Sequence, residues 1–247
     1  MIVRRLPRSF FDRPVVEVAR DLLGGHVEGR GVRIRVTEVE AYAGRTDAAA
    51  HSFRGPTRRS AVMFGPPGHL YVYFTYGMHW CVNLVCGREG VASAVLLRAG
   101  AVVGGLDVAR ARTPSPLTER RLASGPARLA RVLGLSGADS GLDLCTADSP
   151  LRVRPYRGVI GGGTRPAPDT APGTGADQGC PDDHDAPQSA GQRSGGAGST
   201  SLADDGRIRC GPRVGVTGAA DWPWRFWIAD EPTVTAYRTA LPRRPRR

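Results

Sequence analysis

The sequence predicts a single α+β domain, because helical and strand patterns alternate along the chain and no internal repeat is visible. Of the 247 residues, 40% are hydrophobic, which is enough for one core and leaves little room for a second. Residues 158–206 interrupt the pattern, since they contain no aromatic residue and are rich in Gly, Pro, Ala, Ser and Asp. Such a segment buries too little apolar surface to offset its ordering entropy. We expect residues 1–157 plus 207–242 to form the domain, 158–206 to be a disordered acidic insertion, and 243–247 to be a basic tail.

Two helices are predicted from apolar residues that recur on one stripe. The first covers residues 13–23, with Asp12 as its cap. The second covers residues 126–133, begins with a proline, which suits the first helical turn, and stops at Gly134. Strands are predicted at 32–42, 70–75, 78–85, 92–98, 213–216 and 225–228.

The formal net charge is +11, and all 34 basic residues are arginines. Residues 158–206 contribute −5, so the rest of the chain carries +16. This excess fits either a polyanionic partner such as nucleic acid or a solvated basic surface. Without a lysine, only the N-terminal amine could form a Schiff base with a sugar aldehyde.

Several classes of protein are not indicated. No apolar run approaches the ~20 residues of a membrane helix, and the longest candidate, 91–106, is broken by Arg98. The N-terminus lacks the apolar stretch of a secretory signal. The cysteines form no CxxC pair, so a zinc site is not indicated. We expect a cytoplasmic protein that uses no metal or cofactor and has no membrane partner.

Two carboxylates continue the apolar side of the first strand. Alternate residues of a strand share a face, which here comprises Val32, Ile34, Val36, Glu38, Glu40 and Tyr42. One interpretation is a general base tuned by burial. The alternatives are a twist or bulge that lets both carboxylates reach water, and a structural ion pair with an arginine. Arg98, at the end of another apolar strand, is expected to pair with this acidic strand unless it reaches water at a sheet edge.

Residues 65–84 predict a β-hairpin with a tight turn near Tyr76 and Gly77. Tyr71, Phe74 and Trp80 are interpreted as packing residues, because a hydrophobic hairpin usually buries its aromatic side chains. Tyr76 lies beside the turn, where side chains face solvent, and on a basic protein it could act as a wedge between stacked bases. His51 lies in a loop whose pattern alone indicates no catalytic role.

These segments together resemble the alkyladenine (3-methyladenine) DNA glycosylase family. The matching stretches, in the order of the family, are FFDRPVVEVARDLLG, VTEVEAYAGRTDAAAHS, MFGPPGHLYVYFTYGMHWCVN, VLLRA, SGPARL, RVGV and WRFWI. The resemblance implies a curved, mainly antiparallel sheet with flanking helices and a protruding hairpin. It also implies a monomeric enzyme that rotates alkylated or deaminated purines out of double-stranded DNA and hydrolyses the N-glycosidic bond without a cofactor.

The resemblance also implies roles for individual residues. Glu40 corresponds to the carboxylate that activates water, Arg98 to the arginine that holds this water, and the Val214 backbone carbonyl to its third contact. The walls of the base pocket correspond to Tyr42, His51 and Tyr73. Asn83 corresponds to the side chain that excludes normal guanine. The residue inserted into DNA corresponds to Tyr76, with Met78 beside it.

Two other functions remain open from the residues themselves. A protein that binds damaged DNA without cutting it would share the hairpin and the basic charge, but it would not need Glu40 and Arg98. A hydrolase of free nucleosides would leave the wedge and the basic charge unexplained. The lesion spectrum, the role of the insertion and the group that protonates neutral leaving bases are not indicated by the sequence.

Overall fold

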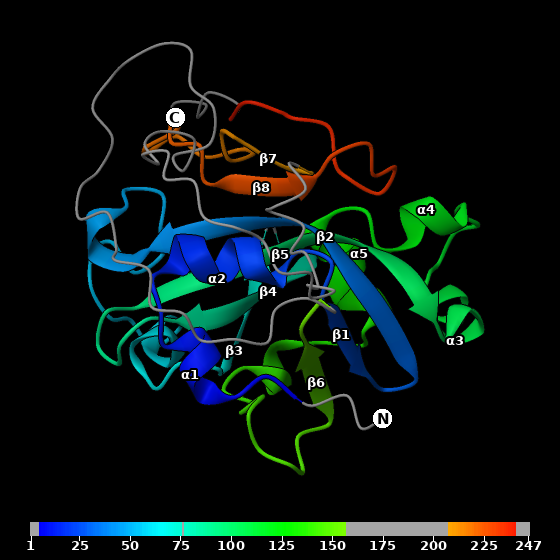
Figure 1. The fold of residues 1–247 in the computed structure, drawn as a ribbon, viewed down its shortest axis with the longest axis horizontal. Coiled ribbons are helices and arrows are strands. Elements are labelled where there is room, and N and C mark those ends of the chain that lie inside the picture. The colour runs from blue at the N-terminus through cyan, green and yellow to red at the C-terminus, as the bar shows by residue number, and fades with distance from the viewer. Residues whose placement is uncertain (1–4, 76, 157–206, 241–247) are drawn as a thin grey trace, which may run out of the picture.

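The computed structural model describes residues 5–75, 77–156 and 207–240. The expected insertion at 158–206, the basic tail at 243–247 and the wedge residue Tyr76 lie outside these described residues. Within them the protein is an α+β domain built on a curled antiparallel sheet, as the sequence predicted (Figure 1). No helix in this part of the chain is long and apolar enough to cross a membrane.

The described residues form an eight-stranded sheet in which every pairing is antiparallel. Six strands follow the order β3-β4-β5-β2-β1-β6, and β7 joins through β8, which pairs with β2. The strands are β1 His26–Gly29, β2 Val32–Ala43, β3 Leu70–Thr75, β4 His79–Cys86, β5 Ser93–Gly104, β6 Leu151–Arg154, β7 Ile208–Gly211 and β8 Arg225–Ile228.

Short helices flank the sheet. The α-helices are α1 Arg8–Phe11, α2 Val15–Leu22, α3 Leu106–Ala111, α4 Glu119–Leu122 and α5 Pro126–Val132. Single 3-10 turns occupy Gly44–Thr46, Ala61–Phe64 and Gly137–Asp139. Helix α2 packs against β2 and β5, and α5 packs against β4 and β5 (Figure 1). The apolar faces of both helices contribute to the main hydrophobic core.

The second predicted helix is confirmed, and the cap of the first is corrected. Helix α5 starts at Pro126, and Gly134 follows it with the positive φ that a helix stop requires. Asp12, however, does not cap α2; it ends the preceding helix α1. Pro14 has non-helical backbone angles and directly precedes Val15, and a proline disfavours the helical conformation in the residue before it, here Arg13, so α2 begins only after both.

A β-bulge in β2 overturns the expected alternation of its side chains. Core residues occupy even positions as far as Val36, but the odd positions Val39 and Ala41 take over beyond it. The pairing with β5 shifts register before Glu38 and shifts back after it, so the ladder is irregular in both strands at this point. Glu38 and Glu40 therefore lie on the face opposite Val36. The bulge does not carry them into water, because both residues are 0% exposed.

This change of phase gives the sheet two different faces. One face carries the apolar core residues Leu70, Val72, Val82, Leu84, Val95, Leu97, Val39 and Ala41. The opposite face of β3 and β4 carries three directly paired couples, Tyr71–Asn83, Tyr73–Cys81 and Thr75–His79. Leu96 of β5 pairs with both Asn83 and Glu40, so the second face continues across β5 onto β2. Polar and aromatic side chains gather on this second face.

The predicted strand at 213–216 is wrong. This segment forms a turn that packs over the sheet, while the neighbouring residues Ile208–Gly211 form β7. Its polar groups bind side chains and carbonyls of distant segments: the Val214 N–H donates to Glu40, and the Arg213 guanidinium pairs with Asp47. These contacts replace the ladder of backbone hydrogen bonds that a strand would need.

Candidate active site

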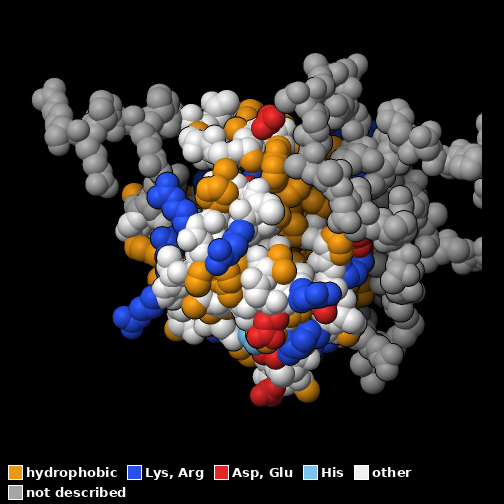
Figure 2. All heavy atoms as spheres, turned by 90° about the vertical axis from the view of Figure 1, so that its left-hand side faces the viewer, with side chains coloured by type: hydrophobic (Ala, Val, Ile, Leu, Met, Phe, Trp, Pro, Cys, Tyr) orange, Lys and Arg blue, Asp and Glu red, His pale blue; other side chains and the backbone are white. Residues whose placement is uncertain are grey.

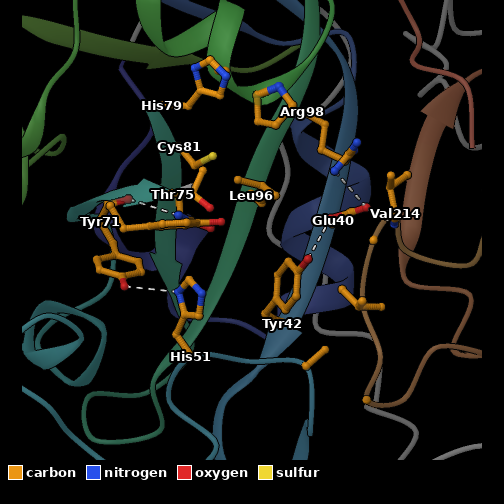
Figure 3. A pocket seen from close by; sticks show the side chains of 18 of the residues that line it. Glu40, Tyr42, His51, Tyr71, Thr75, His79, Cys81, Leu96, Arg98 and Val214 are labelled. Carbon is orange, nitrogen blue, oxygen red and sulfur yellow. Dashed lines mark hydrogen bonds and ion pairs between the residues drawn. The ribbon is translucent and has the colours of Figure 1, made fainter. Parts of the chain in front are cut away.

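A pocket of about 520 Å³ opens on the second face of the sheet. Its floor comes from β2–β5, and its walls come from residues 48–51, residues 214–218 and the start of α5. Glu40, Arg98 and Tyr42 lie on one side, with His51 and Tyr71 on the other (Figure 3). This volume lies within the range of small-molecule sites, and aromatic walls with a few polar groups are typical of them.

Glu40 is fully buried although it lines the pocket. Oε1 accepts a hydrogen bond from the Val214 N–H at 2.7 Å, and Oε2 accepts one from the Tyr42 hydroxyl at 2.8 Å. Nη1 of Arg98 lies 3.3 Å from Oε1. Val214 and Tyr42 donate hydrogen bonds and Arg98 adds a positive charge, which together stabilise negative charge on the carboxylate. A carboxylate can accept about four hydrogen bonds, so acceptor capacity remains for a water molecule.

Arg98 joins the two buried glutamates, as the sequence predicted. It is 7% exposed, and its Nε donates to Glu38 Oε1 at 2.9 Å. Burial by itself would lower the pKa of Arg98, but the adjacent Glu40 and Glu38 outweigh burial and raise it. The alternative of an edge arginine that reaches water is wrong, because β5 lies inside the sheet between β4 and β2.

Glu38 lies at the centre of a second buried cluster that the sequence analysis did not identify. Its Oε1 also accepts from Arg225 Nε at 2.7 Å and from Thr235 Oγ1 at 2.8 Å. Its Oε2 accepts the Thr235 N–H at 2.7 Å. The cluster fastens β8 and the following segment to β2, and it holds Arg98 in place beside Glu40.

Tyrosine and histidine rings form the opposite wall. The ring of His51 meets Tyr73 edge-on at a centroid distance of 4.5 Å, and its Nδ1 lies 3.3 Å from the Tyr71 hydroxyl. Burial and the nearby Arg59 charge lower the pKa of His51, which favours a neutral imidazole. Burial raises the pKa values of Tyr42 and Tyr73 well above the ordinary range, so both are neutral phenols.

The other predicted site residues divide into those at the pocket and those at the hairpin tip. Asn83 is buried, lines the pocket, and its Nδ2 donates to the Tyr71 carbonyl at 3.2 Å. Met78 is 64% exposed near the tip, beyond the pocket. Phe74 was expected to pack in the core, but it is 42% exposed. Its ring contacts Trp80 at a centroid distance of 4.6 Å.

Some pocket residues were missed although the strand pattern contained a signal for them. Thr75, His79 and Cys81 line the pocket. They share the alternation of Tyr71, Tyr73 and Asn83 along the hairpin, so a face count would have found them. Arg213 and Asp47, which pair behind the pocket, had no signal in the local pattern.

Metal-ligating side chains form no cluster within the residues that the structure describes. Among residues 5–75, 77–156 and 207–240, no group of three or more His, Cys, Asp or Glu side chains could hold a metal ion. Figure 2 shows one face of the molecule, where arginine side chains are interspersed with acidic, hydrophobic and uncharged surface.

Fold and site together define the class of a hydrolase. The pocket has aromatic walls that suit a small planar group, and its buried carboxylate, held by an arginine, suits hydrolysis beside that group. The family model described as "Methylpurine-DNA glycosylase (MPG)" matches residues 9–168. The chain belongs to this family, and the resemblance inferred from the sequence motifs is confirmed. It is a DNA glycosylase, an enzyme that hydrolyses N-glycosyl bonds.

Bacterial relatives match almost the whole chain. A protein of Frankia casuarinae is 46% identical over 238 residues, covering 96% of this chain and 94% of the relative. One of Streptomyces avermitilis is 43% identical over 247 residues, with 98% and 95% covered. One of Mycobacterium tuberculosis is 40% identical over 228 residues, with 90% and 89% covered. All three carry the name "Putative 3-methyladenine DNA glycosylase".

Proposed function

We propose that this DNA glycosylase rotates alkylated purines such as 3-methyladenine out of duplex DNA and hydrolyses their N-glycosidic bond, leaving an abasic site. The observation that carries the proposal is the fully buried Glu40 carboxylate, held at the pocket by hydrogen bonds from Tyr42 and Val214 and by an ion pair with Arg98. The names of the bacterial relatives support the choice of substrate.

Glu40 acts as the general base. A water molecule bound to its carboxylate attacks the anomeric carbon of the extruded nucleotide, and Glu40 accepts the proton. The new carbon–oxygen bond replaces the N-glycosidic bond, and the base departs with the electron pair of that bond. The negative charge of Glu40 also stabilises the positive charge that develops on the sugar. Arg98 orients the carboxylate, and the Val214 carbonyl is the further contact for the water.

The pocket recognises the damaged base by its charge and its edge. Alkylation at a ring nitrogen makes many purines cationic, and the electron-rich faces of Tyr42 and Tyr73 attract such rings. A neutral His51 adds no repulsive charge. A cationic base leaves as a neutral molecule, so its departure needs no acid. Asn83 crowds the exocyclic amine of normal guanine and excludes it.

The direct test is the release of free base. Duplexes that each contain one lesion, either 3-methyladenine, 7-methylguanine, hypoxanthine or ethenoadenine, are incubated with the enzyme, and the released bases are separated by chromatography. Free 3-methyladenine with an intact strand is the expected result. Tight binding of the damaged duplex without released base would favour the alternative of a damage-binding protein.

The absence of lysine from the sequence supports a monofunctional enzyme, because strand cleavage through a lysine Schiff base is excluded. The product is therefore an abasic site in an unbroken strand. The enzyme works as a monomer on double-stranded DNA, and its arginines neutralise phosphates. Strand breaks that appear before alkali treatment would contradict this part of the proposal.

Tyr76 fills the gap that the extruded nucleotide leaves in the base stack. We expect Tyr76→Ser to reduce the affinity for lesion-containing duplex about 5- to 100-fold, because aromatic stacking contributes roughly 1–3 kcal/mol per base. Fluorescence of a 2-aminopurine next to the lesion reports the extruded state, and it should fall with the affinity. Tyr237→Ser is the matched control, because it removes an exposed tyrosine outside the pocket. Unchanged binding and extrusion by Tyr76→Ser would remove the wedge role.

A further inference from the structure

A buried ion pair between Arg213 and Asp47 lies behind the wall of the pocket. Both side chains are 0% exposed. The pair is bidentate: Nη1 of Arg213 lies 2.5 Å from Asp47 Oδ2, and Nη2 lies 2.8 Å from Oδ1. Neither residue lines the pocket, so the pair cannot itself touch the substrate. Its position matters because Arg213 and Asp47 each hold a segment that lines the pocket.

Arg213 fastens its own segment to β2 next to Glu40. Its Nη1 also donates to the Ala41 carbonyl at 2.9 Å, and its guanidinium covers the Tyr42 ring at 4.7 Å. The next residue, Val214, donates its N–H to Glu40 at 2.7 Å. Two consecutive residues of the turn thus bind neighbouring residues of β2. Fixing the Arg213 side chain restricts the peptide plane that presents the Val214 N–H.

Asp47 shapes the loop that follows it and ties this loop to Arg213. Its Oδ1 accepts the Ala49 N–H at 3.0 Å, and its Oδ2 accepts the Ala43 N–H at 3.2 Å. The loop that it shapes supplies Ala48, Ala49 and His51 to the pocket. The two loops touch closely, since a Cβ at Gly218 would lie 2.7 Å from the Ala48 backbone.

We propose that the Arg213–Asp47 pair is a positioning device that sets the Val214 N–H on Glu40 and joins the two loops that close the pocket. This inference rests on the proposed role of Glu40. The ion pair acts through the geometry of the turn, because a guanidinium offers a rigid planar fork that an ammonium of equal charge lacks. Loss of the fork frees the turn and removes one donor from the Glu40 carboxylate.

The test is the pH dependence of base release by Arg213→Lys in single-turnover assays. The ionised carboxylate is the active form, so the rate falls at low pH along an acidic limb. We expect this limb to move upward by roughly one pH unit, which is a tenfold change, because one charge-assisted hydrogen bond to the carboxylate is lost. Affinity for undamaged duplex, which places no base in the pocket, should remain unchanged, since Arg213 does not line the pocket and lysine keeps its charge.

The other groups around Glu40 stay in place in Arg213→Lys. A shift of the acidic limb therefore reports the position of the turn that carries Val214. The titratable and charged groups that face Glu40 are Tyr42 from β2, Tyr73 from β3, Cys81 from β4, Arg98 from β5 and, behind the Tyr42 ring, Arg213. Lysine keeps the positive charge at 213. A shift therefore measures the geometry of the hydrogen bond and excludes a simple change of charge.

Arg30→Lys is the matched control, because Arg30 also donates from two nitrogens to an aspartate, Asp139, outside the pocket. Its acidic limb should coincide with that of the wild type. If Arg213→Lys does not fold, Asp47→Glu replaces it, because it keeps the negative charge while it displaces the carboxylate from the fork, and the same upward shift is expected. An unmoved limb in the variant that folds, whatever its overall rate, overturns the inference. Base release by Glu40→Gln would instead overturn the proposed function, so the two failures are distinguishable.

Discussion

Glu40→Gln is expected to slow the release of alkylated purine by about 10²–10⁴-fold, the usual contribution of a general base. The amide has nearly the same shape as the carboxylate, so it still fills the space between Tyr42 and Val214. It cannot accept a proton from water, and it carries no charge to stabilise the developing positive sugar. Single-turnover assays on a duplex with one 3-methyladenine measure the loss.

The same variant should bind DNA nearly as well as the wild type, because Glu40 is fully buried at the pocket wall and the amide nearly keeps its shape. Glu28→Gln is the matched control: Glu28 pairs with Arg154 between β1 and β6, outside the pocket. It should retain base release. A Glu40→Gln enzyme that works at a rate close to that of the control would exclude Glu40 as the base.

Glu38→Gln is expected to lower the free energy of unfolding by about 3–5 kcal/mol, the cost of removing one partner from a buried ion pair. Arg98 and Arg225 are 7% and 5% exposed, and both donate to the same oxygen of Glu38. The amide leaves two buried guanidinium groups without a full countercharge. Equilibrium unfolding in urea, followed by tryptophan fluorescence, measures the change.

An exposed ion pair provides the comparison for this stability change. Arg110 and Glu119 lie 2.8 Å apart with side chains 50% and 64% exposed, so Glu119→Gln should cost no more than about 1 kcal/mol. Equal losses for the two variants would show that the buried cluster contributes no more than a surface pair. Where Glu38→Gln remains folded, its base release should also fall, because Arg98 is no longer fixed beside Glu40.

The local sequence pattern was sufficient for most elements. Strands β3 and β8 have the predicted bounds, because period-two alternation and flanking turn residues mark each strand. Helix α5 was equally clear from Pro126 and Gly134. The resemblance to the family directed attention to Glu40, Arg98, Tyr42 and Tyr73, and the structure brings all four to one pocket.

Where local pattern and tertiary contacts disagreed, the tertiary contacts prevailed. The stretch R-V-G-V reads as a strand, but Arg213 and Val214 bind Asp47 and Glu40 and form a turn. The even positions of β2 read as one face, but the bulge at Glu38 reverses the alternation. Asp12 reads as a helix cap, but it ends the short helix before Pro14. In each case a residue distant in sequence or a neighbouring proline made the competing conformation more stable.

The sequence by itself determined the kinds of chemistry available: a basic chain without lysine, a glutamate pair on one strand, an arginine on another and an aromatic hairpin. Only the tertiary structure decided that Glu40 faces the pocket while Val39 and Ala41 face the core. It alone paired Arg213 with Asp47, 166 residues away along the chain. The physical reason is that burial makes an unpaired charge costly, so the partner of each buried group is selected by the packed fold, and short-range propensity contains no information about that choice.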